Sequence, residues 1–158
     1  MSIAPYASSP LPVVRQMLVL AELRPGELIY DLGSGDGRVV IMAAQEFGAR
    51  GIGVELREDL VKQAIEKISE LNINDKVKIV QRDLFYVDLS DADVITLYIT
   101  TSANDKVKPK LESELKQGAR VVTHEYEIPG WKPRKVDKFY ENPRLGYPSH
   151  TLYVYKIS

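Results

Sequence analysis

A loop with three glycines, each separated by one residue, is the feature that most constrains the fold of this chain. The loop is Asp31-Leu32-Gly33-Ser34-Gly35-Asp36-Gly37-Arg38. It follows a short apolar run, residues 28–32, that favours a strand, and it precedes residues 39–47, whose apolar positions have helical spacing. Glycines without a Cβ let the chain turn sharply and let a ligand approach backbone N–H groups at a helix N-terminus. The loop therefore predicts a strand–turn–helix unit with a ligand site at the turn.

The alternation of strand and helix patterns continues along the chain. A lead-in helix is predicted over residues 13–23 and ends before Pro25-Gly26. Further strands are predicted at 51–55, 77–80, 92–98, 119–124, 136–140 and 152–157, and further helices at 58–71 and 105–116. Such alternation predicts an α/β fold with a doubly wound, mostly parallel sheet, finished by two tail strands.

Composition limits the class of protein. The 158 residues carry a net charge of -1, and 44% are hydrophobic, which fits one globular domain over residues 1–158. The absence of cysteine excludes disulfides, cysteine zinc sites and thiol nucleophiles. With no apolar segment long enough to span a membrane and no leader pattern, we expect a cytoplasmic protein without a membrane partner. Residues 1–12, with prolines 5, 10 and 12, are predicted to form a flexible arm or lid.

The charges are unevenly distributed. Residues 1–100 contain 10 basic and 15 acidic side chains, and residues 101–158 contain 11 and 7. The basic part includes Lys106, Lys108, Lys110, Lys132, Arg134 and Lys135. A basic face attracts phosphate-rich partners, but a pI near 6.1 is low for a dedicated nucleic-acid binder. We therefore interpret the excess as solvated surface and expect no nucleic-acid partner.

The spacing of the glycine loop differs from that of dinucleotide-binding proteins. Those have a third glycine where this chain has Arg38, whereas a Gly-x-Gly-x-Gly loop two residues after an acid resembles S-adenosylmethionine (AdoMet) methyltransferases. Backbone groups of Gly33, Ser34, Gly35 and Gly37 are candidates to contact the ligand. Asp31 could accept a hydrogen bond from the ligand's ammonium, directly or through water. A glycine turn that serves only the fold is the alternative.

Two further acids follow predicted strands. Glu55 ends the strand 51–55, where a carboxylate can accept both hydroxyls of a ribose. Asp83 follows the next strand and could bond an adenine amino group, while Leu84 and Phe85 cover the ring.

Together these motifs resemble the Rossmann-like, seven-β-strand class I methyltransferases over residues 13–131. Within that superfamily the chain is similar to small protein lysine methyltransferases, the broad-specificity archaeal enzyme and its mitochondrial relatives that modify an ATP synthase subunit. The segments that carry this similarity are Pro5-Tyr6 with Pro10, the glycine loop, 97–101, 120–124 and 129–131. The glycine loop and the strand after it also resemble the non-SET histone H3 lysine methyltransferases, but those have an Asn-rich segment where this chain has Leu97-Tyr98-Ile99. The resemblance implies AdoMet-dependent methylation of lysine ε-amino groups in proteins, by a sheet whose C-terminal strand is antiparallel.

The acceptor side is less well defined by sequence. Tyr98 ends a predicted strand beside the expected methyl position and is a candidate to hold the acceptor amine, although a tyrosine that packs at the edge of the core fits equally well. Tyr6 is a candidate to fold over AdoMet. His124 and Glu125 end a predicted strand and could polarise the acceptor site, although a histidine that is hydrogen-bonded at a strand end is the commoner outcome. For Trp131, packing in the core or at the substrate rim is preferred to a cation cage. Methyl transfer requires alignment and exclusion of water, so no metal is expected.

Two rival functions stay open. RNA methylation at a ribose or ring nitrogen is one, whereas the Asn/Asp-Pro-Pro-aromatic segment for exocyclic base amines is absent from residues 97–100. A non-catalytic AdoMet-binding partner subunit is the other. Because the core accounts for nearly all residues, little chain is left to enclose a small metabolite. We therefore expect an open acceptor site, a macromolecular substrate and a monomer.

Overall fold

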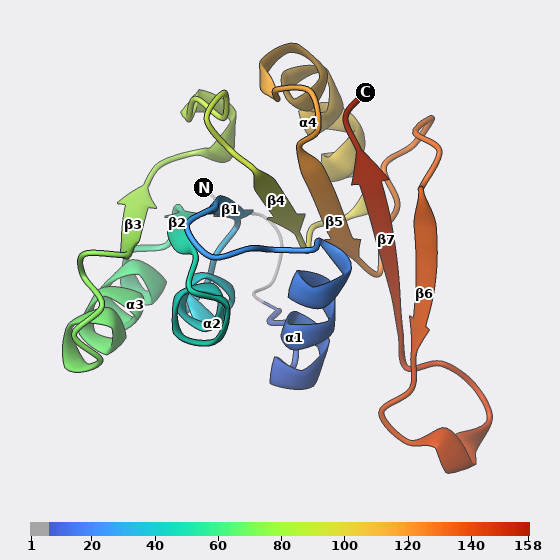
Figure 1. Ribbon diagram of the computed structural model, residues 1–158, viewed down its shortest axis with the longest axis horizontal. Helices are drawn as coiled ribbons and strands as arrows, with labels where there is room; N and C mark the ends of the chain where they lie inside the picture. The colour runs from blue at the N-terminus through green and yellow to red at the C-terminus, as the bar shows by residue number, and fades with distance from the viewer. Residues whose placement is uncertain (1–6) are drawn as a thin grey trace.

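The computed structural model describes residues 7–158 of the chain (Figure 1). Its elements run in the order α1 (Leu11–Leu20), β1 (Leu28–Leu32), α2 (Arg38–Phe47), β2 (Arg50–Glu55), α3 (Glu58–Glu70), β3 (Val77–Gln81), η1 (Leu84–Tyr86), β4 (Val94–Leu97), α4 (Thr101–Glu114), β5 (Arg120–His124), β6 (Lys135–Phe139), η2 (Pro143–Leu145) and β7 (His150–Lys156).

The strands form one seven-stranded sheet in the order β3-β2-β1-β4-β5-β7-β6. Strands β1 to β5 pair in parallel, β7 is antiparallel to β5, and β6 is antiparallel to β7. This is the predicted Rossmann-like methyltransferase sheet. The order reverses direction at β1 and β4, which is where ligands bind in doubly wound sheets, beyond the carboxyl ends of the strands.

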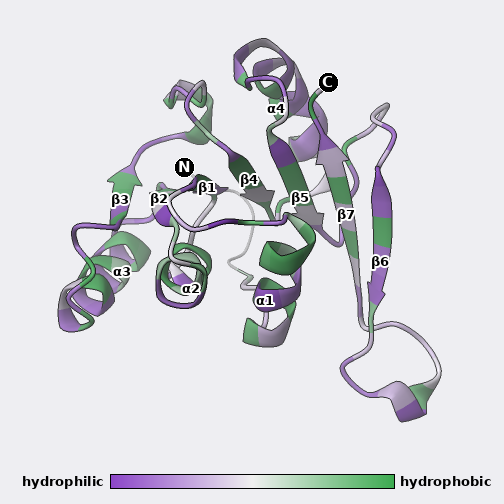
Figure 2. Ribbon diagram, viewed as in Figure 1, coloured by the Kyte–Doolittle hydropathy of each residue, from purple (hydrophilic) through white to green (hydrophobic). Residues whose placement is uncertain are grey.

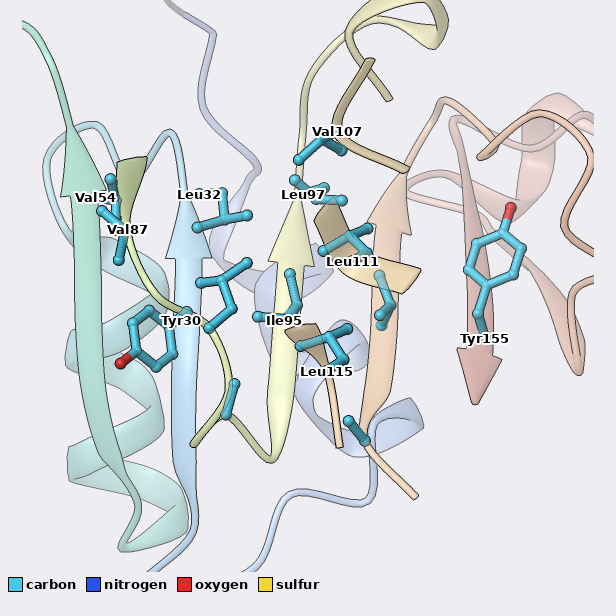
Figure 3. Packing of buried hydrophobic residues seen from close by; sticks show 14 of the residues in the cluster. Tyr30, Leu32, Val54, Val87, Ile95, Leu97, Val107, Leu111, Leu115 and Tyr155 are labelled. Carbon is cyan, nitrogen blue, oxygen red and sulfur yellow. The ribbon is translucent and has the colours of Figure 1, made fainter. Parts of the chain in front are cut away.

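Two apolar layers hold the sheet between helices. Figure 1 shows α1, α2 and α3 on one side and α4 on the other. On the α4 side, Val107, Leu111 and Leu115 pack against side chains from the central strands (Figure 3). On the opposite side, α1 and α2 pack against Ile29, Val94 and Val122 of β1, β4 and β5. Figure 2 shows the consequence as apolar central strands and a more polar edge strand, β6.

The sequence-based elements are confirmed, with shifted ends. Helix α1 begins at Leu11, two residues earlier than predicted, with Pro10 at the N-cap position. Pro12 is tolerated in the first turn, because the N–H that proline lacks would be unpaired there. The predicted arm therefore ends at Pro10, since residues 11 and 12 are helical. Helix α4 begins at Thr101, four residues early, because the Thr100 hydroxyl accepts a hydrogen bond from the Ala103 N–H.

The alternation in the tail is also confirmed. Tyr155 is buried in the layer on the α4 side, and Tyr153 and Ile157 pack against that layer. No helix within residues 7–158 is long and apolar enough to cross a membrane.

Candidate active site

The carboxyl ends of the five parallel strands meet at one edge of the sheet, and the predicted site residues gather there. Asp31 lies in β1, Glu55 ends β2, Asp83 follows β3, and Tyr98 follows β4. Parallel pairing sets Asp31 beside Gly53 of β2 and Thr96 of β4. The topology therefore brings together side chains that are up to 67 residues apart in sequence, from 31 to 98.

Asp31 is a buried acid with little compensation. Its side chain accepts a hydrogen bond of 2.8 Å from the Thr96 hydroxyl. Burial, together with the negative charges of Glu55 and Asp36, raises the pKa of Asp31 to about 7. Arg38 does not offset this charge, because its guanidinium pairs with Asp36 at 2.7 Å. A cationic ligand group beside Asp31 would stabilise the ionised form.

The glycine loop takes backbone conformations that side chains disfavour. Gly33, Gly35 and Gly37 have φ angles of 85°, 57° and 83°. The loop turns back over the end of β2, where the N–H groups of Gly33 and Ser34 donate to the Val54 carbonyl at 2.8 and 2.9 Å. Left-handed backbone at three nearby positions explains why this loop needs glycine.

The neighbouring strand must also carry a glycine. A Cβ on Gly53 would lie 2.6 Å from the Ser34 hydroxyl oxygen and 2.8 Å from the end of Ile79. Ser34 itself is buried, and its hydroxyl has no hydrogen-bond partner among the described residues. An unpaired buried hydroxyl in this loop is available to a polar ligand.

Glu55 joins the loop to the start of α3. One carboxylate oxygen accepts the Gly35 N–H at 2.8 Å, and the other accepts the N–H groups of Leu56 and Arg57 at 3.0 Å each. The side chain is half-buried. Carboxylate oxygens have further lone pairs, so Glu55 can support the loop and still accept from a ligand.

The acid after β3 has a local role in the fold. Asp83 caps the short helix η1 by accepting the Phe85 N–H at 3.0 Å. Leu84 packs against the core, whereas the Phe85 side chain is 42% exposed at the surface. An exposed ring beside a half-buried acid is suited to cover a planar ligand.

On the other half of the edge, Tyr98 stands among aromatic rings. Its ring centroid lies 4.0 Å from that of His124 and 6.4 Å from that of Tyr126. Burial, followed by the neighbouring Tyr126 and Glu125, raises the pKa of Tyr98, so the phenol keeps its proton. Tyr98 also lines a cavity of about 20 Å³ with Asp31 and Ser9. That volume holds about one water molecule.

The chain turns sharply where β5 ends. Glu125 has a φ of 70°, and the Tyr126 N–H donates to the His124 carbonyl across it at 2.8 Å. A γ-turn with positive φ is strained and is rare for a residue other than glycine. Such strain concentrates at functional sites, and here it brings an exposed carboxylate to the rim beside Tyr98.

The chain has only two histidines, and they contact each other. His124 Nε2 and His150 Nδ1 are 2.8 Å apart, His124 Nδ1 lies 2.7 Å from the Ser9 hydroxyl, and His150 Nε2 bonds the Glu141 carboxylate. Donor atoms of His124, Glu125 and His150 lie within 4.8 Å of one another. Two nitrogens that ligate one zinc at about 2.05 Å in tetrahedral geometry are about 3.3 Å apart, so 2.8 Å describes a hydrogen bond instead.

The structure places the predicted Asp31, Glu55, Asp83 and Tyr98 at one edge of the sheet, and their contacts with a cofactor or an acceptor stay a prediction. Sequence reasoning assigned no role to Thr96, His150 or Glu141, and it predicted Ser9 only as part of the N-terminal arm that could cover the cofactor. Two features of the sequence could have pointed to His150. It is one of only two histidines, and it starts a strand whose antiparallel neighbour ends at the other, His124. Tyr6 lies outside the described residues. Trp131 packs edge-on against Tyr155 with centroids 5.6 Å apart, as the packing interpretation predicts.

The sheet order and the glycine loop define a class I AdoMet-dependent methyltransferase. The chain belongs to the ANTKMT methyltransferase domain family, which matches residues 31–135. It is 42% identical to a protein-lysine N-methyltransferase of Saccharolobus islandicus (strain REY15A), over 97% of this chain and 93% of that protein. It is 35% identical to the adenine nucleotide translocase lysine N-methyltransferase of Mus musculus, but covers only 56% of that longer protein and 82% of this chain.

Solved structures show the same fold. An RNA methyltransferase from Salinibacter ruber in complex with S-adenosyl-L-homocysteine superposes with a TM-score of 0.89 at 40% identity, over 96% of this chain and 94% of that one. A geranyl diphosphate methyltransferase in complex with AdoMet superposes with a TM-score of 0.75 at 15% identity, over 94% and 85% of the two chains. This second likeness shows the fold alone.

The residues present fit AdoMet. The buried Asp31 carboxylate lacks a cationic partner among the described residues, which suits the ligand's ammonium. The unpaired Ser34 hydroxyl and the glycine loop supply polar contacts without a Cβ in the way. AdoMet is therefore the methyl donor that this site accepts.

Proposed function

We propose that this protein transfers a methyl group from AdoMet to the ε-amino group of lysine in protein substrates. On the cofactor side, Asp31 binds the ammonium of the donor, Glu55 binds its ribose, and Asp83 bonds the adenine amino group. Leu84 and Phe85 cover the adenine, and the loop residues Gly33, Ser34, Gly35 and Gly37 contact the amino-acid end. Tyr6 remains a candidate to cover the cofactor from the arm.

The chemistry needs alignment more than acid–base catalysis of the transfer itself. AdoMet supplies an electrophilic methyl group on a sulfonium. Tyr98 stands at the end of β4 beside the cavity that reaches Asp31, so its hydroxyl is placed to orient an amine for in-line attack. Removal from water beside the half-buried Tyr98 disfavours a charged ammonium and so favours the free amine.

The aromatic rings and carboxylates at the rim of the acceptor site are the observation that favours lysine as the substrate. Tyr98 and Tyr126 present aromatic surface, and the exposed carboxylates of Glu125 and Glu141 lie on the same edge. Aromatic faces and carboxylates attract an alkylammonium, and carboxylates repel the phosphates of a nucleic acid. The similarity to the archaeal protein-lysine methyltransferase over nearly the whole chain supports the same choice.

RNA methylation is the second candidate, because the related Salinibacter ruber protein is described as an RNA methyltransferase. The position of the basic side chains weighs against it. Lys132, Arg134 and Lys156 gather near the C-terminus around a hollow of about 410 Å³. In the strand register Lys156 of β7 lies opposite Arg120, the first residue of β5. This hollow therefore lies at the edge of the sheet opposite to the site.

The deciding experiment is methyl transfer to separate fractions. The purified protein is incubated with AdoMet labelled in its methyl group and with either mixed protein or mixed RNA. Label in protein, located at lysine by mass spectrometry, is the expected result. Label confined to RNA would overturn the proposal in favour of the second candidate. Binding of AdoMet without label in either fraction would favour a non-catalytic partner subunit.

A further inference from the structure

Four side chains form a continuous hydrogen-bond chain from the site to the surface. Ser9 Oγ lies 2.7 Å from His124 Nδ1, His124 Nε2 lies 2.8 Å from His150 Nδ1, and His150 Nε2 bonds the Glu141 carboxylate. Exposure rises along the chain, because Ser9 and His124 are buried, His150 is half-buried and Glu141 is exposed. The chain thus links a buried hydroxyl to bulk water.

The carboxylate at the outer end sets the direction of every bond. An ionised Glu141 can only accept, so His150 Nε2 carries a proton and donates it. In the neutral ring His150 Nδ1 must then accept from His124 Nε2, which leaves His124 Nδ1 to accept from the Ser9 hydroxyl. These tautomers follow from the bonding network. Because the Ser9 hydroxyl donates its proton to His124, its oxygen lone pairs are available to accept a hydrogen bond from another group.

The inner end of the chain lies at the acceptor half of the site. Ser9 lines the same small cavity as Tyr98 and Asp31, and the ring of Tyr98 packs against that of His124 at a tilt of 33°. The Ser9 carbonyl is held by Arg38 at 3.2 Å, which fixes the segment that carries the hydroxyl. A cation that enters beside Tyr98 would therefore meet an oxygen that can accept a hydrogen bond.

We propose that Ser9, His124, His150 and Glu141 form a proton relay that deprotonates the acceptor ammonium before methyl transfer. This rests on the proposed function, because only an ammonium acceptor has a proton to lose. The ammonium N–H bond breaks as its proton binds Ser9 Oγ, the Ser9 proton passes to His124 Nδ1, and the His124 Nε2 proton passes to His150 Nδ1. His150 becomes an imidazolium paired with Glu141, and the amine keeps the electron pair that attacks the methyl group.

The surroundings suit each ring to a different task. Burial, followed by the charge of His150, lowers the pKa of His124 to about 4, so His124 passes a proton on without holding it. The titratable groups around the two rings include Tyr98 after β4, Glu125 and Tyr126 after β5, and Glu141 after β6. Lys138 of β6 adds a cation nearby, because its ammonium donates to the hydroxyl of Thr151, the residue after His150. Phe139 of β6 adds an apolar ring 6.3 Å from His150. The carboxylates of Glu125 and Glu141 lie beside the two histidines at the outer part of the chain.

The first test is a pH–rate profile. Single-turnover methylation of a lysine peptide is measured from pH 6 to 10 for the wild type, His150→Ala and Glu141→Gln, with Glu127→Gln as a carboxylate control outside the chain. We expect His150→Ala to be about 100-fold slower at pH 7 and to approach the wild-type rate at high pH, where water supplies the free amine. Added imidazole should restore part of the neutral rate. Glu141→Gln should show a smaller loss of the same shape, and AdoMet affinity should be unchanged in every variant.

The second test reads the direction of the chain without activity. Nitrogen NMR of the two histidines should show protonated Nε2 and unprotonated Nδ1 in both rings, and Glu141→Gln should lift this preference. Profiles of His150→Ala and wild type that differ by a constant factor at all pH values would overturn the relay, as would the opposite tautomers. Inhibition of wild type by low micromolar zinc that His150→Ala abolishes would assign the pair to metal binding and overturn the relay too.

Failure of the proposed function gives a separate result. If the wild type transfers label to RNA and to no lysine peptide, the lysine assignment fails, and the relay loses the ammonium that it needs. If the wild type methylates lysine while the profiles stay parallel, the relay alone fails.

Discussion

The two halves of the active edge are built in different ways. In the cofactor half, the acids at the ends of β2 and β3 act mainly with backbone: Glu55 holds the N–H groups of Gly35, Leu56 and Arg57, and Asp83 holds that of Phe85. Asp31 of β1 is the exception, because it accepts from the Thr96 hydroxyl. In the acceptor half, side chains contact side chains across long sequence distances, and Ser9 meets His124 over 115 positions. A site that uses backbone is encoded in a short local motif. A site that uses side-chain pairs exists only once the sheet has assembled.

The buried acid of the cofactor half should show its cost in the stability of the ligand-free protein. With a pKa of about 7 against an ordinary 3.8, folded Asp31 stays protonated over a range where the unfolded chain ionises. Folding therefore takes up a proton, and stability present below pH 4 is lost as the pH rises through 7. At about 1.4 kcal/mol per pH unit, the loss is about 4 kcal/mol. Denaturant unfolding of wild type and Asp31→Asn at pH 4 to 8 measures this loss, as the difference between the two proteins in how their free energy of unfolding changes with pH.

The same substitution has the opposite effect on binding. Asp31→Asn removes the charge that we propose binds the ammonium, so AdoMet affinity should fall about 100-fold while the folded protein gains stability at pH 8. If the free energy of unfolding depends on pH equally in the two proteins, Asp31 is already ionised in the ligand-free protein and is stabilised by a group other than the ligand.

A smaller loss is expected at the ribose position. Glu55→Ala should weaken AdoMet binding by about 2 kcal/mol, or about 30-fold, because a charge-assisted contact is lost and the Gly35 N–H loses its acceptor. Calorimetry measures the affinity, and Glu58→Ala, an exposed acid of α3, is the control. Wild-type affinity in Glu55→Ala would place the ribose elsewhere.

In the acceptor half, removing one hydroxyl should affect the rate and leave cofactor binding intact. Tyr98→Phe should lower kcat for a lysine peptide about tenfold, equivalent to one hydrogen bond of ~1.4 kcal/mol, with AdoMet affinity near wild type. Steady-state kinetics with Tyr147→Phe, an exposed tyrosine, as control checks this. If kcat does not change, Tyr98 only packs against His124 and the amine is oriented by other groups.

The smallest effect concerns the basic side chains outside both halves. If Lys132, Arg134 and Lys156 are solvated surface, RNA should bind weakly and lose affinity steeply between 50 and 200 mM salt. Filter binding with wild type and Lys132→Ala measures this. Tight RNA binding that persists at high salt would favour a nucleic acid as the methyl acceptor and would contradict the assignment of the basic side chains to a surface outside both halves.

Sequence alone predicted which residues of the cofactor half lie at this edge of the sheet, because the glycine loop and the strand ends are local features. Three glycines at single spacing can only mark left-handed backbone or close approach, and the acids at strand ends reach one edge in any parallel sheet. The strand and helix pattern likewise predicted seven strands and their ends to within two residues, because apolar periodicity follows from which face is buried.

Only the tertiary structure decided the acceptor half. The tail hairpin inserts β7 antiparallel beside β5, and that register places the start of β7 next to the end of β5, so His150 meets His124. Nothing in the local sequence of either histidine sets this register. It comes from burying Leu152 and Val154 in the layer shared with α1 and α2 and Tyr155 in the layer opposite, a condition that involves the whole sheet.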